Sequence, residues 1–165
     1  MPVTIHKDGP LCGGTLVDIR TDHMSYVFGI NERGVLQHHH WGLPVAGREL
    51  GDRLRPLRYS SFDAELEREM EEYTFWGGAF YGEPGLKVRF ADGVRDLRMK
   101  VTDVLVDADR GRDRLVLTLK DEHYDLTVRL FYRVFPELDL IERHAEAVNG
   151  GSDDIVLEQF LSAAW

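Results

Sequence analysis

The stretch SYVFGINERGVLQHHHWG, residues 25–42, decides the fold of this chain. Large apolar residues occupy every second position from 26 to 30, which is the period of a pleated strand. Residues 31–34, Asn-Glu-Arg-Gly, are polar and end in a glycine that tolerates a positive φ, so the chain can turn there. Residues 35–41 then run back as a second strand. The stretch therefore predicts a β-hairpin.

The same alternation predicts further strands, separated by turn signals, along the rest of the chain. The clearest strand has apolar residues at every second position from Leu126 to Val134. The other predicted strands cover residues 16–19, 86–90, 96–106, 115–119, 138–148 and 155–162. Strands at this spacing, with almost no helix between them, predict an all-β fold. We expect one domain over residues 1–165, built as an antiparallel β-sandwich.

Residues 60–73, SSFDAELEREMEEY, break this pattern. Their apolar members are spaced as on one face of a helix, and Ser61 or Asp63 could cap its first turn. The acidic residues would then form a solvated face. We therefore predict one short helix here, lying across the sheet edge or at a subunit contact.

The amino-acid composition limits the classes of binding partner and the cellular compartment that we expect for this protein. The chain is 43% apolar and 30% charged, as in ordinary soluble globular proteins. Its formal net charge of −9, without a basic cluster, argues against a nucleic-acid or anionic-membrane partner. It contains neither an apolar run of about 20 residues nor the apolar core of a signal peptide. Cys12 is the single cysteine, which excludes an intrachain disulfide. These features predict a cytoplasmic protein.

Three consecutive histidines, His38, His39 and His40, raise the question of a metal site. On a regular strand His38 and His40 share one face, and His39 points to the other. Two imidazoles on one face could bind zinc together with a third ligand. However, no Cys or Glu follows at the spacing of a known metal motif, and the nearest carboxylate is Glu49. The sequence thus favours a structural role and predicts no metal or other cofactor. A small cupin-like metal enzyme is the least favoured alternative.

Several motifs follow the hairpin in a fixed order. Residues 58–73 read Arg-x-x-Ser-x-Asp…Glu-Tyr, and residues 76–84 read Trp-Gly…Pro. Residues 130–143 read Leu-x-Tyr…Leu-Ile-x-Arg, and residues 149–162 add Asn-Gly-Gly followed by Leu-Glu-Gln-Phe-Leu-Ser. Together with the hairpin, this order resembles the N-terminal domain of family 36 glycoside hydrolases, most of which are α-galactosidases. The resemblance covers about residues 15–163.

The resemblance implies a galactose-mutarotase-like β-supersandwich that precedes a catalytic β/α barrel. A retaining glycosidase needs two carboxyl groups about 5–5.5 Å apart. The family carries both on the barrel, so the resemblance assigns no catalytic residue to this chain. It implies a homo-oligomer in which a loop of this domain reaches a neighbour's α-galactoside pocket. By alignment that loop supplies Arg58 and Asp52, and Trp41 could stack on a sugar face.

Alternatives remain open for each residue and for the whole chain. Arg58 could instead form a surface ion pair, Asp52 could be a turn residue, and Trp41 could be a buried or interface aromatic. The first functional hypothesis is a non-catalytic N-terminal domain that does not hydrolyse galactosides by itself. The second is a free-standing carbohydrate-binding or protein-interaction module. The apolar last strand, ending at Trp165, favours the first hypothesis, in which a barrel follows.

Overall fold

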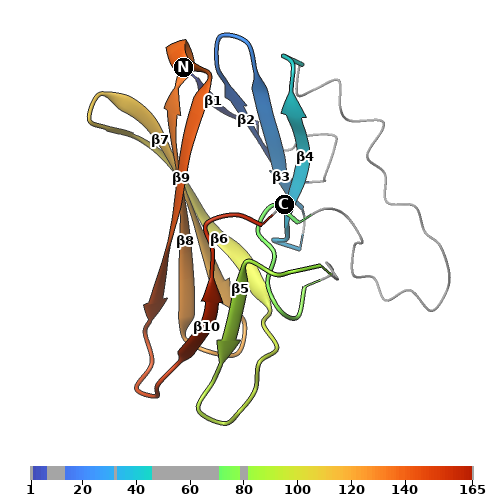
Figure 1. The fold of residues 1–165 in the computed structure, drawn as a ribbon, viewed down its shortest axis with the longest axis vertical. Helices are drawn as coiled ribbons and strands as arrows, with labels where there is room; N and C mark the ends of the chain where they lie inside the picture. The colour runs from blue at the N-terminus through green and yellow to red at the C-terminus, as the bar shows by residue number, and fades with distance from the viewer. Residues whose placement is uncertain (1, 7–13, 32, 46–70, 79–81, 165) are drawn as a thin grey trace, which may run out of the picture.

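The computed structural model describes residues 2–6, 14–31, 33–45, 71–78 and 82–164. Their strands form three antiparallel sheets, with strand orders β1-β2-β3-β4, β6-β7-β8-β9 and β10-β5 (Figure 1). The strands are β1 (Val3–His6), β2 (Thr15–Arg20), β3 (Ser25–Ile30), β4 (Leu36–Gly42), β5 (Leu86–Arg89), β6 (Met99–Asp109), β7 (Arg112–Asp121), β8 (Leu126–Phe135), β9 (Leu140–Asn149) and β10 (Val156–Phe160). A short 3-10 helix, η2 (Pro136–Leu138), joins β8 to β9. The predicted antiparallel β-sandwich is confirmed.

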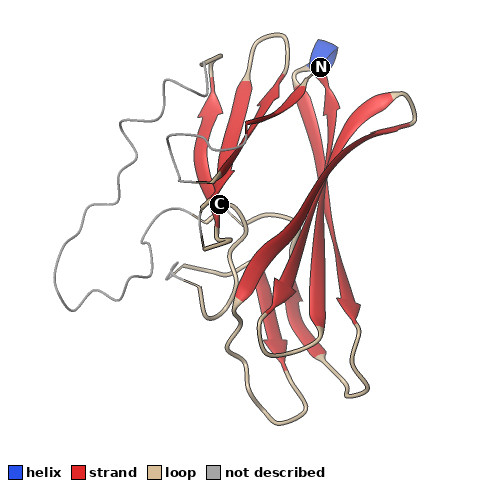
Figure 2. Ribbon diagram, turned by 180° about the vertical axis from the view of Figure 1, so that it is seen from behind, coloured by secondary structure: helices blue, strands red, loops and turns tan. Residues whose placement is uncertain are grey.

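One long sheet, β6–β9, faces the two smaller sheets. Figures 1 and 2 show β1–β4 beside one half of its length and the β5–β10 pair beside the other half. Contacts at the two ends agree with this arrangement. Thr21, after β2, donates to the Oδ1 atom of Asp139, which precedes β9, over 2.7 Å. At the other end the ring of Phe90, after β5, stacks on Tyr124, which precedes β8.

The core lies between these layers and follows the predicted alternation. Every second residue of β8, from Leu126 to Val134, is at most 2% exposed. These side chains meet inward residues of the facing sheets, such as Phe28, whose ring stacks on Tyr132 at 5.4 Å. Each buried large apolar side chain contributes about 1.5–3 kcal/mol to folding. The two-residue period therefore places on one face of each strand the apolar side chains that hold the layers together.

The hairpin predicted from residues 25–42 is confirmed as β3 and β4. Gly34 has a φ of +79°, as expected for the last residue of the turn. The side-chain oxygen of Asn31 accepts hydrogen bonds from the backbone N–H groups of Arg33, at 2.9 Å, and Val35, at 3.0 Å. Asn31 thus satisfies these two backbone donors of the turn and fixes where β4 begins.

The predicted helix over residues 60–73 is wrong at its last three residues. Glu71 forms an isolated antiparallel bridge with Gln37, and the Glu72 N–H donates to the carbonyl of Leu36. Glu72 is also 2% exposed, so it does not belong to a solvated acidic face. Residues 60–70 lie outside the described residues, as do Cys12 and Glu49. No described segment forms a helix long and apolar enough to cross a membrane.

The Trp76-Gly77 motif has a structural explanation. The Trp76 N–H donates to the carbonyl of Leu86, and the Trp76 carbonyl accepts from the Leu97 N–H at 2.9 Å. Gly77 follows with a φ of +106°. A Cβ atom at Gly77 would lie 2.5 Å from the carbonyl oxygen of Leu97. The position therefore requires glycine for both its backbone angle and its close approach.

Candidate functional site

Of the three predicted sugar-binding residues, the structure describes one. Arg58 and Asp52 lie outside the described residues. Trp41 lies near the end of β4, and its side chain is 59% exposed. Its direct cross-strand partner is Tyr26 of β3, and the two rings pack edge to face with centroids 6.2 Å apart. Trp41 therefore combines an exposed indole with a contact to a buried aromatic residue.

Beneath Trp41 lies a buried polar cluster centred on Glu72. The Glu72 side chain is fully buried, and its Oε1 atom accepts hydrogen bonds from two tyrosine hydroxyls, Tyr26 at 2.6 Å and Tyr132 at 2.7 Å. Its Oε2 atom lies 2.8 Å from His38 Nδ1. A carboxylate accepts and does not donate, so His38 carries a proton on Nδ1. We call Tyr26, His38, Glu72, Tyr132 and Arg143 the Glu72 cluster.

Arg143 of β9 balances the charge of Glu72. One guanidinium nitrogen donates to Glu72 Oε1 at 2.7 Å and another to the Glu72 backbone carbonyl at 3.0 Å. The Arg143 side chain is only 9% exposed, and its guanidinium lies 5.0 Å from the centre of the Tyr132 ring. A buried carboxylate is tolerated when it is paired and hydrogen-bonded, and Glu72 meets both conditions.

The protonation of the two tyrosines follows from their surroundings. Burial, and then the negative charge of Glu72, raise the pKa of Tyr26 well above its ordinary value. The same two causes, in the same order, raise the pKa of Tyr132. Both hydroxyls therefore keep their protons and donate to Glu72. The cluster works as a structural junction between β3, β4, β8 and β9, and it holds no ionised tyrosine for acid–base chemistry.

The three histidines diverge because the strand is not regular. A β-bulge shifts the register, so His38 pairs with Phe28 while His40 pairs with Val27. Neighbouring residues on β3 point to opposite faces, so His38 and His40 do too. The prediction that they share a face is therefore wrong. His40 Nε2 lies 3.0 Å from the carbonyl of Leu43. Within the described ranges, no three His, Cys, Asp or Glu side chains converge as metal ligands.

Acidification is expected to destabilise the fold through His39, the extra residue of the bulge. Burial, and then the nearby His38, lower the pKa of His39 to about 4 from the 6.5 of an unperturbed histidine. Between pH 6.5 and 4 the unfolded chain therefore binds more protons, and stability falls as the pH falls. We expect a loss of about 1–2 kcal/mol, allowing for partial exposure.

Urea denaturation at a series of pH values measures this effect. The matched variant His39→Gln lacks the titrating ring. The difference in free energy of unfolding between the two proteins should therefore change between pH 6.5 and 4 and be constant above pH 7. Parallel stability curves over the whole range would show that His39 is not the group responsible.

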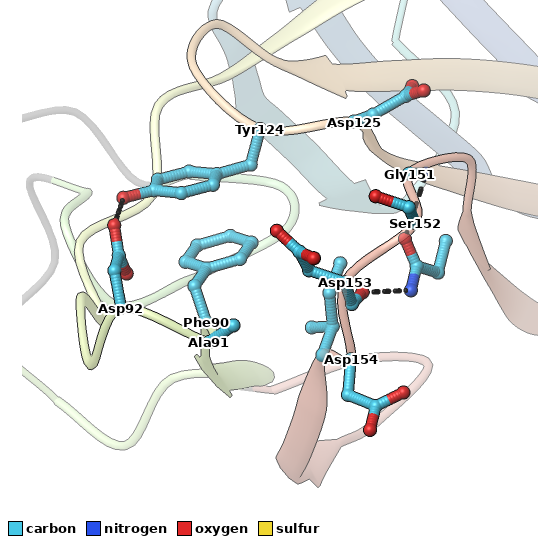
Figure 3. Close-up of a pocket in the computed structure, with 11 residues that line it drawn as sticks. Phe90, Ala91, Asp92, Tyr124, Asp125, Gly151, Ser152, Asp153 and Asp154 are labelled. Atoms are coloured by element: carbon cyan, nitrogen blue, oxygen red, sulfur yellow. Dashed lines mark hydrogen bonds between the residues drawn. The ribbon is translucent and has the colours of Figure 1, made fainter.

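A second candidate is an open hollow of about 250 Å³ between loops at the β5–β10 end (Figure 3). The rings of Phe90 and Tyr124 stack on one side of it with centroids 3.6 Å apart. The Tyr124 hydroxyl donates to Asp92 Oδ2 at 2.7 Å, and hydrogen bonds from the Val94 N–H and from Tyr124 keep the pKa of Asp92 below its usual range. Figure 3 shows Asp153 turned towards the aromatic pair. These bonds tie the loops to one another, and Trp41, the one predicted site residue that the structure describes, is not among the described residues that line the hollow.

Only weak signals in the sequence point to the Glu72 cluster. Inward positions of β9 carry Ile141, Arg143, Ala145 and Ala147, so an arginine in an otherwise apolar row is the signal for a buried ion pair. Nothing in the sequence identifies its partner, because Glu72 stands among several other acidic residues.

The fold and the motifs define a β-sandwich domain of the kind found in glycoside hydrolases, and comparison with known proteins identifies the family. Residues 34–165 match the glycosyl hydrolase family 36 N-terminal domain. This chain belongs to that family.

Individual relatives agree with this assignment. The probable α-galactosidase G of Aspergillus terreus is 28% identical over 164 residues, which cover 90% of this chain and 22% of that protein. The α-galactosidase from Lactobacillus brevis has a similar fold, with a TM-score of 0.79 and 22% identity over 90% of this chain and 23% of that one. The GH36 α-galactosidase AgaB from Geobacillus stearothermophilus has a TM-score of 0.78 and 22% identity over 98% and 24% of the two chains. This chain spans about a quarter of the length of these relatives.

Proposed function

We propose that this chain is the non-catalytic N-terminal domain of a cytoplasmic α-galactosidase-like retaining glycoside hydrolase. In this role it supports a catalytic β/α barrel and takes part in a homo-oligomer. The observation that carries the proposal is the family match over residues 34–165, in a chain that covers only 22% of a probable α-galactosidase. A barrel with two catalytic carboxyl groups needs far more chain than this sandwich contains.

The proposal includes a contribution to the sugar pocket. Arg58 and Asp52 would bind vicinal hydroxyls through paired hydrogen bonds, and Trp41 would pack on an apolar sugar face. The exposed indole of Trp41 supports this role, since an aromatic residue can contact a ligand only where it is accessible. The substrate would be an α-galactoside, because a related α-galactosidase, AgaA from Geobacillus stearothermophilus, has been solved in complex with raffinose.

The purified 165-residue chain is expected not to hydrolyse 4-nitrophenyl α-galactoside. A retaining glycosidase needs two catalytic carboxyl groups, and in the proposed enzyme both lie on the barrel and not in this chain. Release of 4-nitrophenol should match that of a heat-inactivated sample of the same preparation. Turnover that follows the folded chain through purification would contradict the proposal.

A free-standing carbohydrate-binding module is the second candidate, and the 59% exposure of Trp41 is the observation that favours it. Titration calorimetry of the purified chain with galactose and raffinose distinguishes the two. A module should bind with a Kd of about 1 mM or tighter, whereas a supporting domain should show no heat beyond dilution. A Trp41→Ala variant is the matched control, since any binding through the indole should disappear with it.

Sequencing the source DNA beyond the codon for Trp165 provides an independent test. An open frame that encodes a β/α barrel with two aspartates at strand ends would support the domain role. A stop codon directly after Trp165 would favour the module.

A further inference from the structure

We infer that Tyr26 and Glu72 are positioning residues that fix the orientation of the Trp41 indole at the rim of the sandwich. The inference rests on the proposed function, in which Trp41 contacts the galactoside. The Trp41 indole would then be oriented in the free chain, before a sugar binds.

Trp41 and Tyr26 are in direct contact. The two residues are direct partners in the antiparallel register of β3 and β4, so their side chains lie on the same face of the sheet. Their rings meet at an interplanar angle of 71°, which is the edge-to-face arrangement that aromatic pairs prefer. Tyr26 is 5% exposed and Trp41 is 59% exposed, so the pair runs from the interior to the surface.

Tyr26 is itself held in place. Its hydroxyl donates to Glu72 Oε1 at 2.6 Å, and its ring also packs edge-on against His38 at 5.2 Å. Glu72 is in turn bonded to Tyr132 and Arg143, which belong to the opposite sheet. Rotation of the Tyr26 ring would separate its buried hydroxyl from this acceptor, which is unfavourable.

The anchoring of Tyr26 bears on ligand binding through Trp41. Trp41 packs on a ring that is bonded to both layers of the sandwich. An indole with such a support is already ordered, and an ordered side chain loses less conformational entropy when a ligand packs on it. Tyr26 and Glu72 would therefore favour galactoside binding without touching the sugar.

Fluorescence of Trp41 in the 165-residue chain tests the inference directly. Trp76→Phe and Trp165→Phe leave Trp41 as the only tryptophan, and its anisotropy decay then reports local motion of this indole. We expect restricted motion, with a squared order parameter of about 0.8, in this background. Tyr26→Phe removes the hydroxyl and should lower the value below about 0.6, the range of flexible groups.

Tyr132→Phe is the matched control. It removes a hydroxyl that donates to the same Glu72 oxygen from a ring that is also buried, but the Tyr132 ring packs on Phe28 and Tyr26. The two variants should lose similar stability, while only Tyr26→Phe should release Trp41. Equal Trp41 motion in the two variants would overturn the inference. If Tyr26→Phe does not fold, the protein that carries only Trp76→Phe and Trp165→Phe still tests the inference. Free rotation of the Trp41 indole in that protein overturns it.

These outcomes are separate from those of the proposed function. A fixed Trp41 in a chain whose reading frame ends at Trp165 would leave the positioning role intact and remove the galactosidase role. A freely rotating Trp41 in a chain that continues into a barrel would do the reverse.

Discussion

Replacing Arg143 by leucine is expected to lower the free energy of unfolding of this chain by about 3–5 kcal/mol. The change removes the charge that balances Glu72, whose side chain is fully buried. It also removes the two hydrogen bonds that Arg143 donates, one to the Glu72 carboxylate and one to the Glu72 backbone carbonyl. An uncompensated buried carboxylate is far more costly than a lost surface contact. Urea denaturation at pH 7 measures the change.

Arg95→Leu is the matched control for Arg143→Leu. Arg95 also pairs with a glutamate, Glu158, at 2.8 Å, but the two side chains are 46% and 27% exposed. An exposed ion pair contributes at most about 1 kcal/mol, so this variant should be nearly as stable as the natural sequence. Equal losses of stability in the two variants would mean that the buried Arg143–Glu72 pair contributes no more than an exposed ion pair, which contradicts this prediction.

Replacing Gly77 by alanine is expected to be almost as damaging, with a loss of about 2–5 kcal/mol. The new Cβ atom would lie 2.5 Å from the Leu97 carbonyl oxygen and 2.6 Å from the Leu97 nitrogen. Both are backbone atoms, so relief requires the two segments to separate. The φ of +106° adds strain for any residue with a side chain. Thermal or urea unfolding of the variant measures the loss.

Gly93→Ala separates the two causes. Gly93 also has a positive φ, +88°, but a Cβ atom there would meet nothing within 4 Å. This variant should lose only the backbone contribution, about 1–2 kcal/mol. If Gly77→Ala costs no more than Gly93→Ala, the close approach to Leu97 is unimportant and the Trp76-Gly77 motif needs another explanation.

Most strands could be predicted because the two-residue period is a local property of the chain. The hairpin of β3 and β4 and the strand from Leu126 follow directly from apolar alternation and from turn residues such as Asn31 and Gly34. The sequence pattern does not predict the short strand β1, because four residues show too few repeats of the period. The predicted helix is wrong at Glu72, where one buried ion pair outweighs the local helical spacing.

The candidate site was less predictable because it depends on contacts between distant segments. The aromatic position of Trp41 could be proposed from the sequence, but its support by Tyr26 depends on the strand register. The bulge at His39 leaves no mark on the sequence pattern, so alternation alone predicts the wrong faces for His38 and His40. Glu72 and Arg143 are 71 residues apart, and only the packing of the two sheets brings them together.

The pairing of β5 with β10 has a consequence for how the domain is made. β1–β4 and β6–β9 are both meanders, in which each strand pairs with its neighbour in the chain. In contrast, Arg89 of β5 pairs with Val156 of β10, so this sheet encloses the whole β6–β9 meander in sequence. During synthesis the two meanders can assemble from chain already released, but β5 must wait for β10. The hydrophobic end of the sandwich that contains Val88 thus stays uncovered on one side until almost the entire domain has left the ribosome.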